Sequence, residues 1–111
     1  MDANGKVYAH VVKKFTNPLI EGTGFVVGAT HQDELTEIGK LIDATKVPLL
    51  IPGVGTQGAS IKDVISALGS NPINRINASS SVIYAFEKTK EEDYVKAALN
   101  EIKKMHDEFK W

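Results

Sequence analysis

Four stretches of the chain carry apolar residues at the spacing of an amphipathic helix. The first covers residues 5–15, and we expect it to end before Asn17-Pro18, because the residue before a proline is disfavoured in the helical region. The second and third have their apolar stripes within residues 35–42 and 61–68. The fourth runs to the C-terminus, and its predicted apolar face consists of Tyr94, Ala98, Ile102, Met105 and Phe109.

A serine or threonine followed three residues later by an acidic residue marks the predicted start of the last three helices. This spacing allows a capping box, in which the two side chains bond reciprocally to the backbone N–H groups of the first helical turn. The pairs are Thr30 with Asp33, Ser60 with Asp63, and Thr89 with Glu92.

Three short apolar runs, at residues 25–27, 45–51 and 73–78, predict strands. The middle run is apolar without alternation, which is typical of a strand covered on both sides. A strand, a loop and a capped helix thus follow one another three times, which indicates parallel βα units. Three strands cannot close a barrel, and their two open edges invite pairing with another chain. The pattern therefore predicts either a small α/β layer that oligomerises through its edges or part of a larger barrel.

Glycines and serines gather directly after the second and third predicted strands. The apolar run ends at Pro52, and Gly53, Gly55 and Gly58 precede the helix that opens at Ser60. Backbone without Cβ atoms lets a ligand approach closely, and a helix N-terminus directs free N–H groups at an anion. We interpret this loop as one side of a phosphate site, with the rest of the chain providing the other side and the scaffold. The alternatives are an ordinary βα connection and a helix cap, neither holding a ligand.

The composition of the chain restricts its possible binding partners more than it restricts the fold. The chain has 111 residues, of which 42% are apolar and 24% charged, and its net charge is −1. This composition predicts one globular domain and gives no electrostatic argument for nucleic acid. Without cysteine there are neither disulfides nor thiolate metal ligands, and no run is long enough to span a membrane, so we expect a cytoplasmic protein. The histidines lack ligand spacing, which favours surface or packing roles and no metal: His10, His31 and His106.

Three motifs, in this order, resemble those of the orotidine 5'-phosphate decarboxylase family, a cofactor-free family of TIM-barrel enzymes. Residues 25–38 resemble the sixth strand of the family and the helix after it, residues 50–58 the seventh strand, and residues 76–85 the eighth strand with its phosphate-binding turn. The resemblance implies an α/β fold, a partial TIM (βα)8 barrel with three parallel βα units between an N-terminal and a C-terminal helix. It also implies that residues 1–111 form a single domain, the C-terminal segment of such a barrel.

The resemblance assigns binding roles to particular residues. Gln57 corresponds to the glutamine that bridges the pyrimidine and the phosphate, and Gly55 and Gly58 to glycines that keep that loop tight. Ser79 and its neighbours correspond to the turn whose backbone N–H groups hold the phosphate. Ser80, however, replaces an arginine of the family. A hydrogen bond to a charged group contributes about 1.5–3 kcal/mol, so this loss should weaken phosphate binding roughly 10- to 100-fold.

The catalytic Asp-x-Lys-x-x-Asp signature of the family is absent from this sequence. We therefore expect a segment that binds orotidine 5'-phosphate or UMP without a cofactor, and without catalytic residues of its own. It would be inactive unless the missing N-terminal part of the barrel joins it. Two alternatives stay open: a non-catalytic phosphate-binding half-barrel that self-associates through its sheet edges, and a structural fragment that binds no ligand.

Overall fold

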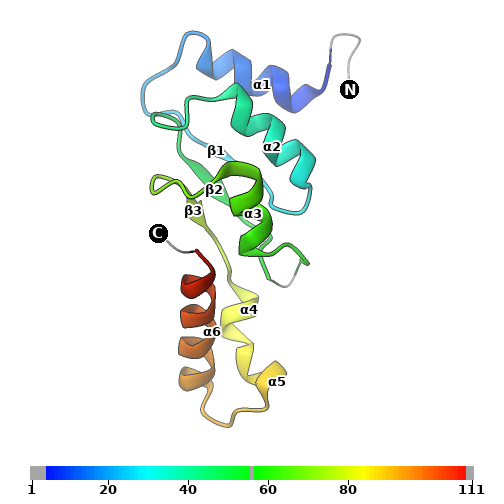
Figure 1. Cartoon of the computed structure of the whole chain (residues 1–111), viewed down its shortest axis with the longest axis vertical. Coiled ribbons are helices and arrows are strands. Elements are labelled where there is room, and N and C mark those ends of the chain that lie inside the picture. The colour runs from blue at the N-terminus through cyan, green and yellow to red at the C-terminus, as the bar shows by residue number, and fades with distance from the viewer. Residues whose placement is uncertain (1–4, 56, 110–111) are drawn as a thin grey trace.

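The computed structural model describes residues 5–55 and 57–109, and Figure 1 shows the arrangement of its elements. In chain order they are α1 (Val7–Thr16), β1 (Phe25–Val26), α2 (Gln32–Leu41), β2 (Leu49–Ile51), α3 (Ile61–Leu68), β3 (Arg75–Ile76), α4 (Ser80–Ile83), α5 (Ala85–Thr89) and α6 (Tyr94–Phe109). The strands form one parallel sheet in the order β1-β2-β3. The expected architecture, part of an α/β barrel flanked by an N-terminal and a C-terminal helix, is confirmed.

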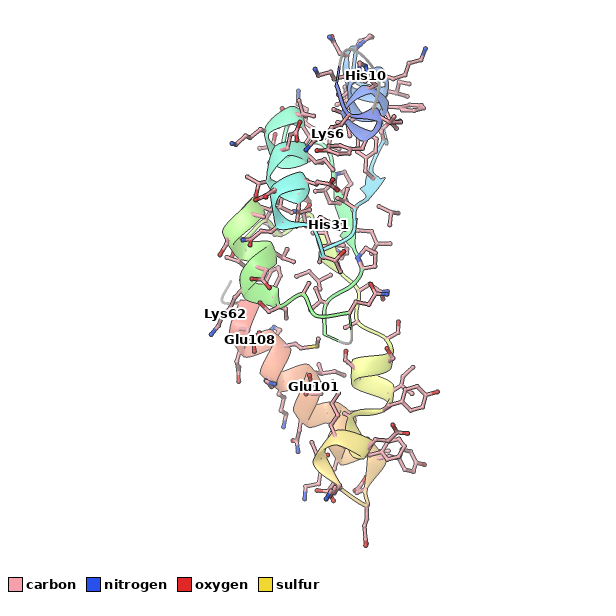
Figure 2. The ribbon with its side chains drawn as sticks, turned by 90° about the vertical axis from the view of Figure 1, so that its right-hand side faces the viewer. Lys6, His10, His31, Lys62, Glu101 and Glu108 are labelled. Atoms are coloured by element: carbon pink, nitrogen blue, oxygen red, sulfur yellow. The ribbon has the colours of Figure 1, made fainter. Side chains whose placement is uncertain are left out.

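The two faces of this sheet differ in what covers them. Phe25 pairs in register with Leu49, and Val26 pairs with Leu50. Because side chains alternate along a strand, Leu49 and Ile51 point to one face, where they share the core cluster with side chains of α2 and α3, and they are 1% and 0% exposed. Leu50 points to the other face and is 43% exposed. Its partner in register, Val26, lies on the same face and is 70% exposed. Figure 2 shows α2 and α3 together on one side of the strands. We call these the covered face and the uncovered face.

The prediction for residues 45–51 was therefore wrong in two respects. The strand is shorter, because Asp43 holds the chain in a turn by accepting hydrogen bonds from the Thr45 N–H at 2.9 Å and the Thr45 hydroxyl at 2.6 Å. Its burial also alternates, so that Leu50 is apolar without being covered. The third strand is likewise shorter than predicted, and only Arg75–Ile76 pairs as strand.

The capping box that opens α3 is confirmed. The Ser60 hydroxyl accepts a hydrogen bond from the Asp63 N–H at 3.1 Å, and Asp63 Oδ2 accepts one from the Ser60 N–H at 2.8 Å. Gly69 ends the same helix with a φ of 72°. The sequence therefore defines both ends of α3 locally.

The other two predicted capping boxes do not form. His31 is the N-cap of α2, without a side-chain cap bond, in place of Thr30. Thr89 belongs to α5, where its hydroxyl donates to the Ala85 carbonyl at 3.0 Å. The last helix begins at Tyr94, and Asp93 caps it by accepting from the Lys96 N–H at 3.0 Å.

The last helix joins the rest of the molecule through its C-terminal end. Phe109 is part of the core cluster and Met105 packs against it, as predicted. Tyr94, by contrast, is 67% exposed, while Ala97 is buried. The lower part of α6 packs against α4 and α5, which gives the elongated shape of Figure 1, 52 × 27 × 21 Å. No helix in the described ranges has the length and apolar character needed to cross a membrane.

A buried asparagine joins the start of β3 to β2. Asn74 is 8% exposed, and its Oδ1 accepts a hydrogen bond from the Leu49 N–H at 3.0 Å. A buried amide is stable only when its polar atoms are paired, and this bond provides a partner inside the sheet. Asn74 thus extends the β2–β3 pairing by one side-chain link.

Candidate functional site

The loop after β2 lies at the carboxyl end of the sheet, and we call its described residues, 52–55 and 57–60, the glycine loop. Gly55 donates its N–H to the Ala59 carbonyl at 2.8 Å, and Gly58 donates to the Gly55 carbonyl at 3.0 Å. Gly55 and Gly58 have φ values of 90° and 94°, in a region that residues with a Cβ rarely adopt. The glycines predicted to keep this loop tight are therefore required by its backbone.

The glycine loop touches the first turn of the chain after β3. A Cβ added at Gly55 would lie 2.8 Å from both Cβ and Oγ of Ser81. The contact joins the loops of two neighbouring strands at the same end of the sheet, where parallel α/β proteins bind ligands. The two segments that the sequence singled out as the two sides of a site thus lie against each other.

The second side is the run of three serines at residues 79–81, which we call the serine turn. Ser79 precedes α4, and its carbonyl accepts hydrogen bonds from the N–H groups of Val82 at 3.1 Å and Ile83 at 2.9 Å. Ser79 and Ser80 are exposed, whereas Ser81 is only 4% exposed. Within the described ranges, Ser81 Oγ finds no hydrogen-bond partner. A buried hydroxyl without a partner destabilises the fold, which makes Ser81 the most unusual group at this end of the sheet.

The Gln57 side chain lies beside Gly53. Its Oε1 lies 3.0 Å from the position that a Cβ would take at Gly53, beside Thr30 Cγ2 and the Ala29 nitrogen, which lie 3.5 and 3.6 Å from that position. The Ala29 N–H also donates to the Pro52 carbonyl at 2.9 Å. The glycine loop therefore contacts the β1–α2 loop through Gly53 and the serine turn through Gly55.

The charged groups nearest these loops are used in local bonds. The backbone N–H and hydroxyl of Ser60 hold the pKa of the Asp63 carboxyl below its usual value. Arg75 lies at the start of β3, at the opposite end of that strand from Ser79. Its Nη1 donates to the carbonyls of Pro72 at 2.7 Å and Asn74 at 3.0 Å. Arg75 therefore does not substitute for the arginine that the family places at Ser80.

A second polar cluster fastens α1 to α2, away from these loops. Glu37 Oε2 accepts a hydrogen bond from the Tyr8 hydroxyl at 2.6 Å and pairs with Lys6 Nζ at 3.2 Å. The Tyr8 hydroxyl, and then Lys6, lower the pKa of Glu37. Figure 2 shows His10 on α1 well apart from His31 at the start of α2. No group of three metal-binding side chains occurs among residues 5–55 and 57–109.

The sequence predicted a binding role for the serine turn, but it did not predict that Ser81 is the buried one of the three serines. Three consecutive serines after a strand look equivalent in the sequence. Only the contact with Gly55 separates the buried Ser81 from its exposed neighbours. Because Gly55 is distant in the sequence, no local pattern signalled that Ser81 would be the buried one.

Comparison with known proteins identifies one group of relatives. An orotidine 5'-phosphate decarboxylase of Herpetosiphon aurantiacus is 47% identical over 62 residues, which are 56% of this chain and 22% of that protein. The enzyme of the same name from Clostridium perfringens (strain SM101) is 35% identical over 85 residues, 76% of this chain and 29% of that protein. No family model and no solved structure matches the chain.

A third relative with the same name, from Dehalococcoides mccartyi, is 43% identical over 68 residues, 59% of this chain and 24% of that protein. The matches to all three relatives thus cover less than a third of each relative's length. This chain is therefore similar to a part of orotidine 5'-phosphate decarboxylases, and its three parallel βα units agree with such a part.

Proposed function

We propose that this chain provides the phosphate- and pyrimidine-binding loops of an orotidine 5'-phosphate decarboxylase, as the C-terminal segment of its barrel. The reaction is decarboxylation of orotidine 5'-phosphate to UMP. The contact between Gly55 and Ser81 supports this assignment most directly, because it brings together the loops after two adjacent strands. In TIM barrels, phosphate sites are frequently built from the loops after the last two strands and a short extra helix.

The proposed roles follow from this arrangement. Backbone N–H groups of the serine turn hold the phosphate, and the glycine loop approaches it closely because Gly55 and Gly58 carry no side chain. Gln57 turns from Gly53 toward the ligand and bridges its pyrimidine and phosphate. Ser81 Oγ, buried and without a partner within the described ranges, provides a further donor if the turn opens slightly.

The chain does not carry the groups for the chemical step. The 111 residues contain no Asp-x-Lys-x-x-Asp pattern, so they offer no lysine positioned between two aspartates to protonate a carbanion. In the proposal this chain binds and orients the substrate, and the catalytic lysine and aspartates come from another segment of the barrel. The chain alone then binds nucleotide without decarboxylating it.

Calorimetric titration of the full chain with UMP, inorganic phosphate and uridine tests the binding role. We expect UMP and phosphate to compete for one site and uridine alone to bind much more weakly. Ser80→Arg, which restores the arginine of the family, should raise the affinity for UMP about 10- to 100-fold. Absence of UMP binding in both the natural chain and this variant would overturn the proposal.

An assay that follows the loss of orotate absorbance tests whether catalysis depends on another segment of the barrel. The chain alone should leave orotidine 5'-phosphate unchanged, and clear turnover would contradict the assignment of catalysis to another segment. Ser81→Ala serves as the matched variant for binding. It removes an unpartnered hydroxyl, so it should not reduce stability, and a weaker affinity for UMP would identify Ser81 Oγ as a ligand contact.

A further inference from the structure

The loop between β1 and α2, residues 27–31, contacts the glycine loop on the side away from the sheet. This contact is fixed by Ala29, which is 2% exposed and donates its N–H to the Pro52 carbonyl at 2.9 Å. The next residue, Thr30, is exposed and precedes His31, which Figure 2 labels at the start of α2. A buried residue with a backbone hydrogen bond to the glycine loop therefore determines where the Thr30 side chain lies.

Three groups surround the side of Gly53 on which other residues carry a Cβ. A Cβ at this position would lie 3.0 Å from Gln57 Oε1, 3.5 Å from Thr30 Cγ2 and 3.6 Å from the Ala29 nitrogen. We call Gly53, Ala29 and Thr30 the glutamine seat, because the end of the Gln57 side chain lies against them. Gly53 has a φ of 94°, so a glycine at this position suits the backbone and also leaves room for the Gln57 amide.

The orientation of the amide in the glutamine seat matches the role proposed for Gln57. A glutamine amide accepts hydrogen bonds through Oε1 and donates two through Nε2. The pyrimidine carbonyl and the phosphate oxygens that Gln57 bridges in the proposed function are all acceptors, so both need Nε2. Oε1 is the atom that lies beside Gly53. A small turn of the amide therefore brings Nε2 to the ligand while Oε1 stays in the seat.

Holding Gln57 in one place has a consequence for affinity. The side chain is exposed and has several rotatable bonds, so fixing it on a ligand costs rotamer entropy. A side chain that is already held loses less of this entropy on binding. We propose that Thr30 is a positioning residue, whose methyl group holds Gln57 against Gly53 with Nε2 available to a pyrimidine nucleotide. The identity of the ligand rests on the proposed function, whereas the glutamine seat rests on the contacts around Gly53.

Calorimetric titration of the full chain with UMP and with inorganic phosphate tests this role. Thr30→Ala removes the methyl group and should weaken UMP binding about three- to tenfold. The affinity for inorganic phosphate should fall much less, because the serine turn provides most of the donors for phosphate. Thr30→Val keeps a methyl group in the same place and should retain the affinity of the natural chain for UMP.

Combining Thr30→Ala with Gln57→Ala separates positioning from a structural role. If Thr30 acts through Gln57, Thr30→Ala should have no further effect on UMP binding once the amide is removed. A purely structural role would instead weaken UMP and phosphate binding equally and persist beside Gln57→Ala. That result, or an unchanged affinity for UMP in Thr30→Ala alone, would overturn the proposal.

Gly53→Ala and Gly58→Ala test the other side of the glutamine seat. Both glycines have a φ of 94°, so the two variants carry the same kind of backbone strain. Only at Gly53 would the added Cβ meet Gln57 Oε1, since it has open space at Gly58. Gly53→Ala should therefore lose more affinity for UMP than Gly58→Ala. Equal losses would contradict a role of the seat in placing the amide.

Nuclear magnetic resonance of the ligand-free chain tests the glutamine seat without the proposed function. We expect an Overhauser contact between the Thr30 methyl group and the Gln57 side chain. The resonances of the Gln57 side-chain amide should shift in Thr30→Ala and stay in place in Thr30→Val. Absence of this contact would overturn the inference. A chain that shows the contact but does not bind UMP would leave the seat intact and count against the proposed function instead.

Discussion

The covered and uncovered faces of the sheet are built from alternate residues of the same strands, yet their burial differs sharply. Leu49 and Ile51 are enclosed by α2 and α3, whereas Leu50 between them is 43% exposed. The uncovered face also carries Arg75 in register with Leu50. An apolar strand pattern therefore indicates which side chains can be buried, but what buries them depends on neighbouring elements. The following predictions test this contrast, from the largest expected effect to the smallest.

Leu49→Ala and Leu50→Ala compare the two faces with the same substitution at adjacent positions. Leu49 is 1% exposed, so its truncation leaves a cavity and should lower the free energy of unfolding by about 2–5 kcal/mol. Leu50→Ala should lower it by less than about 1 kcal/mol, because the side chain is already in contact with water. Urea denaturation of both variants measures the difference. An equally large effect at Leu50 would show that the uncovered face is covered in solution.

Gly55→Ala and Gly58→Ala compare two positions in the glycine loop, at the carboxyl end of the sheet where its two faces meet. Both have φ near +90°, and forcing a Cβ into that region costs roughly 1–2 kcal/mol. Only Gly55 also faces Ser81, at 2.8 Å from the added Cβ, whereas Gly58 has open space. Gly55→Ala should therefore be the more destabilising variant in thermal unfolding and the one that loses more affinity for UMP. Equal effects would mean that the contact between the glycine loop and the serine turn does not hold in solution.

Ser60→Ala and Thr30→Ala compare a helix cap that forms with one that does not, both on the covered side. Ser60 takes part in the capping box of α3, and its loss should cost about 1 kcal/mol in unfolding free energy. Thr30 provides no cap for α2, so Thr30→Ala should change stability by no more than a few tenths of a kcal/mol. Chemical denaturation measures both. A large loss in Thr30→Ala would show that this side chain caps α2 after all.

The dependence of the unfolding free energy on acidic pH should show the smallest effect, and it tests the same capping box of Ser60 and Asp63. The pKa of Asp63 is lowered in the folded chain by the Ser60 N–H and hydroxyl. A carboxyl with a depressed folded pKa stabilises the fold above its unfolded pKa, near pH 4, and this stabilisation is lost as pH falls through the folded value. Asp63→Asn should therefore flatten the decline of unfolding free energy below about pH 4. An unchanged slope would show that other carboxyls dominate the acid response.

The sequence was most informative where structure is determined by neighbouring residues. Parallel βα order, the glycine loop and the capping box of Ser60 all follow from patterns of a few residues, and each is present. Thr30 has the same spacing to an acid as Ser60, but its methyl group lies by Gly53 of the next loop, and α2 begins without it. Tertiary contact thus decides between two equivalent local signals.

The end of the chain shows a second limit of local patterns. Thr89 precedes Glu92 at capping distance, but Lys90 adopts a left-handed conformation with a φ of 53° and ends α5 between them. The helix α6 then begins later, at Tyr94 with Asp93 as its cap, and Ala97 is buried in place of Tyr94. The burial of Ser81 was equally beyond local reasoning, because it depends on Gly55, which is distant in the sequence.

The link from Asn74 to the Leu49 N–H works as a register lock for the last two strands. With only two residue pairs in the β2–β3 ladder, the backbone alone specifies their alignment weakly. A slip by one residue would leave the buried Asn74 amide without its hydrogen-bond partner. It would also turn the Arg75 side chain inward among the core side chains, while the Ile76 side chain would face outward. Asn74 thereby maintains the outward direction of the one cation on this edge strand. Replacing that asparagine should therefore make the alignment of these two strands less specific.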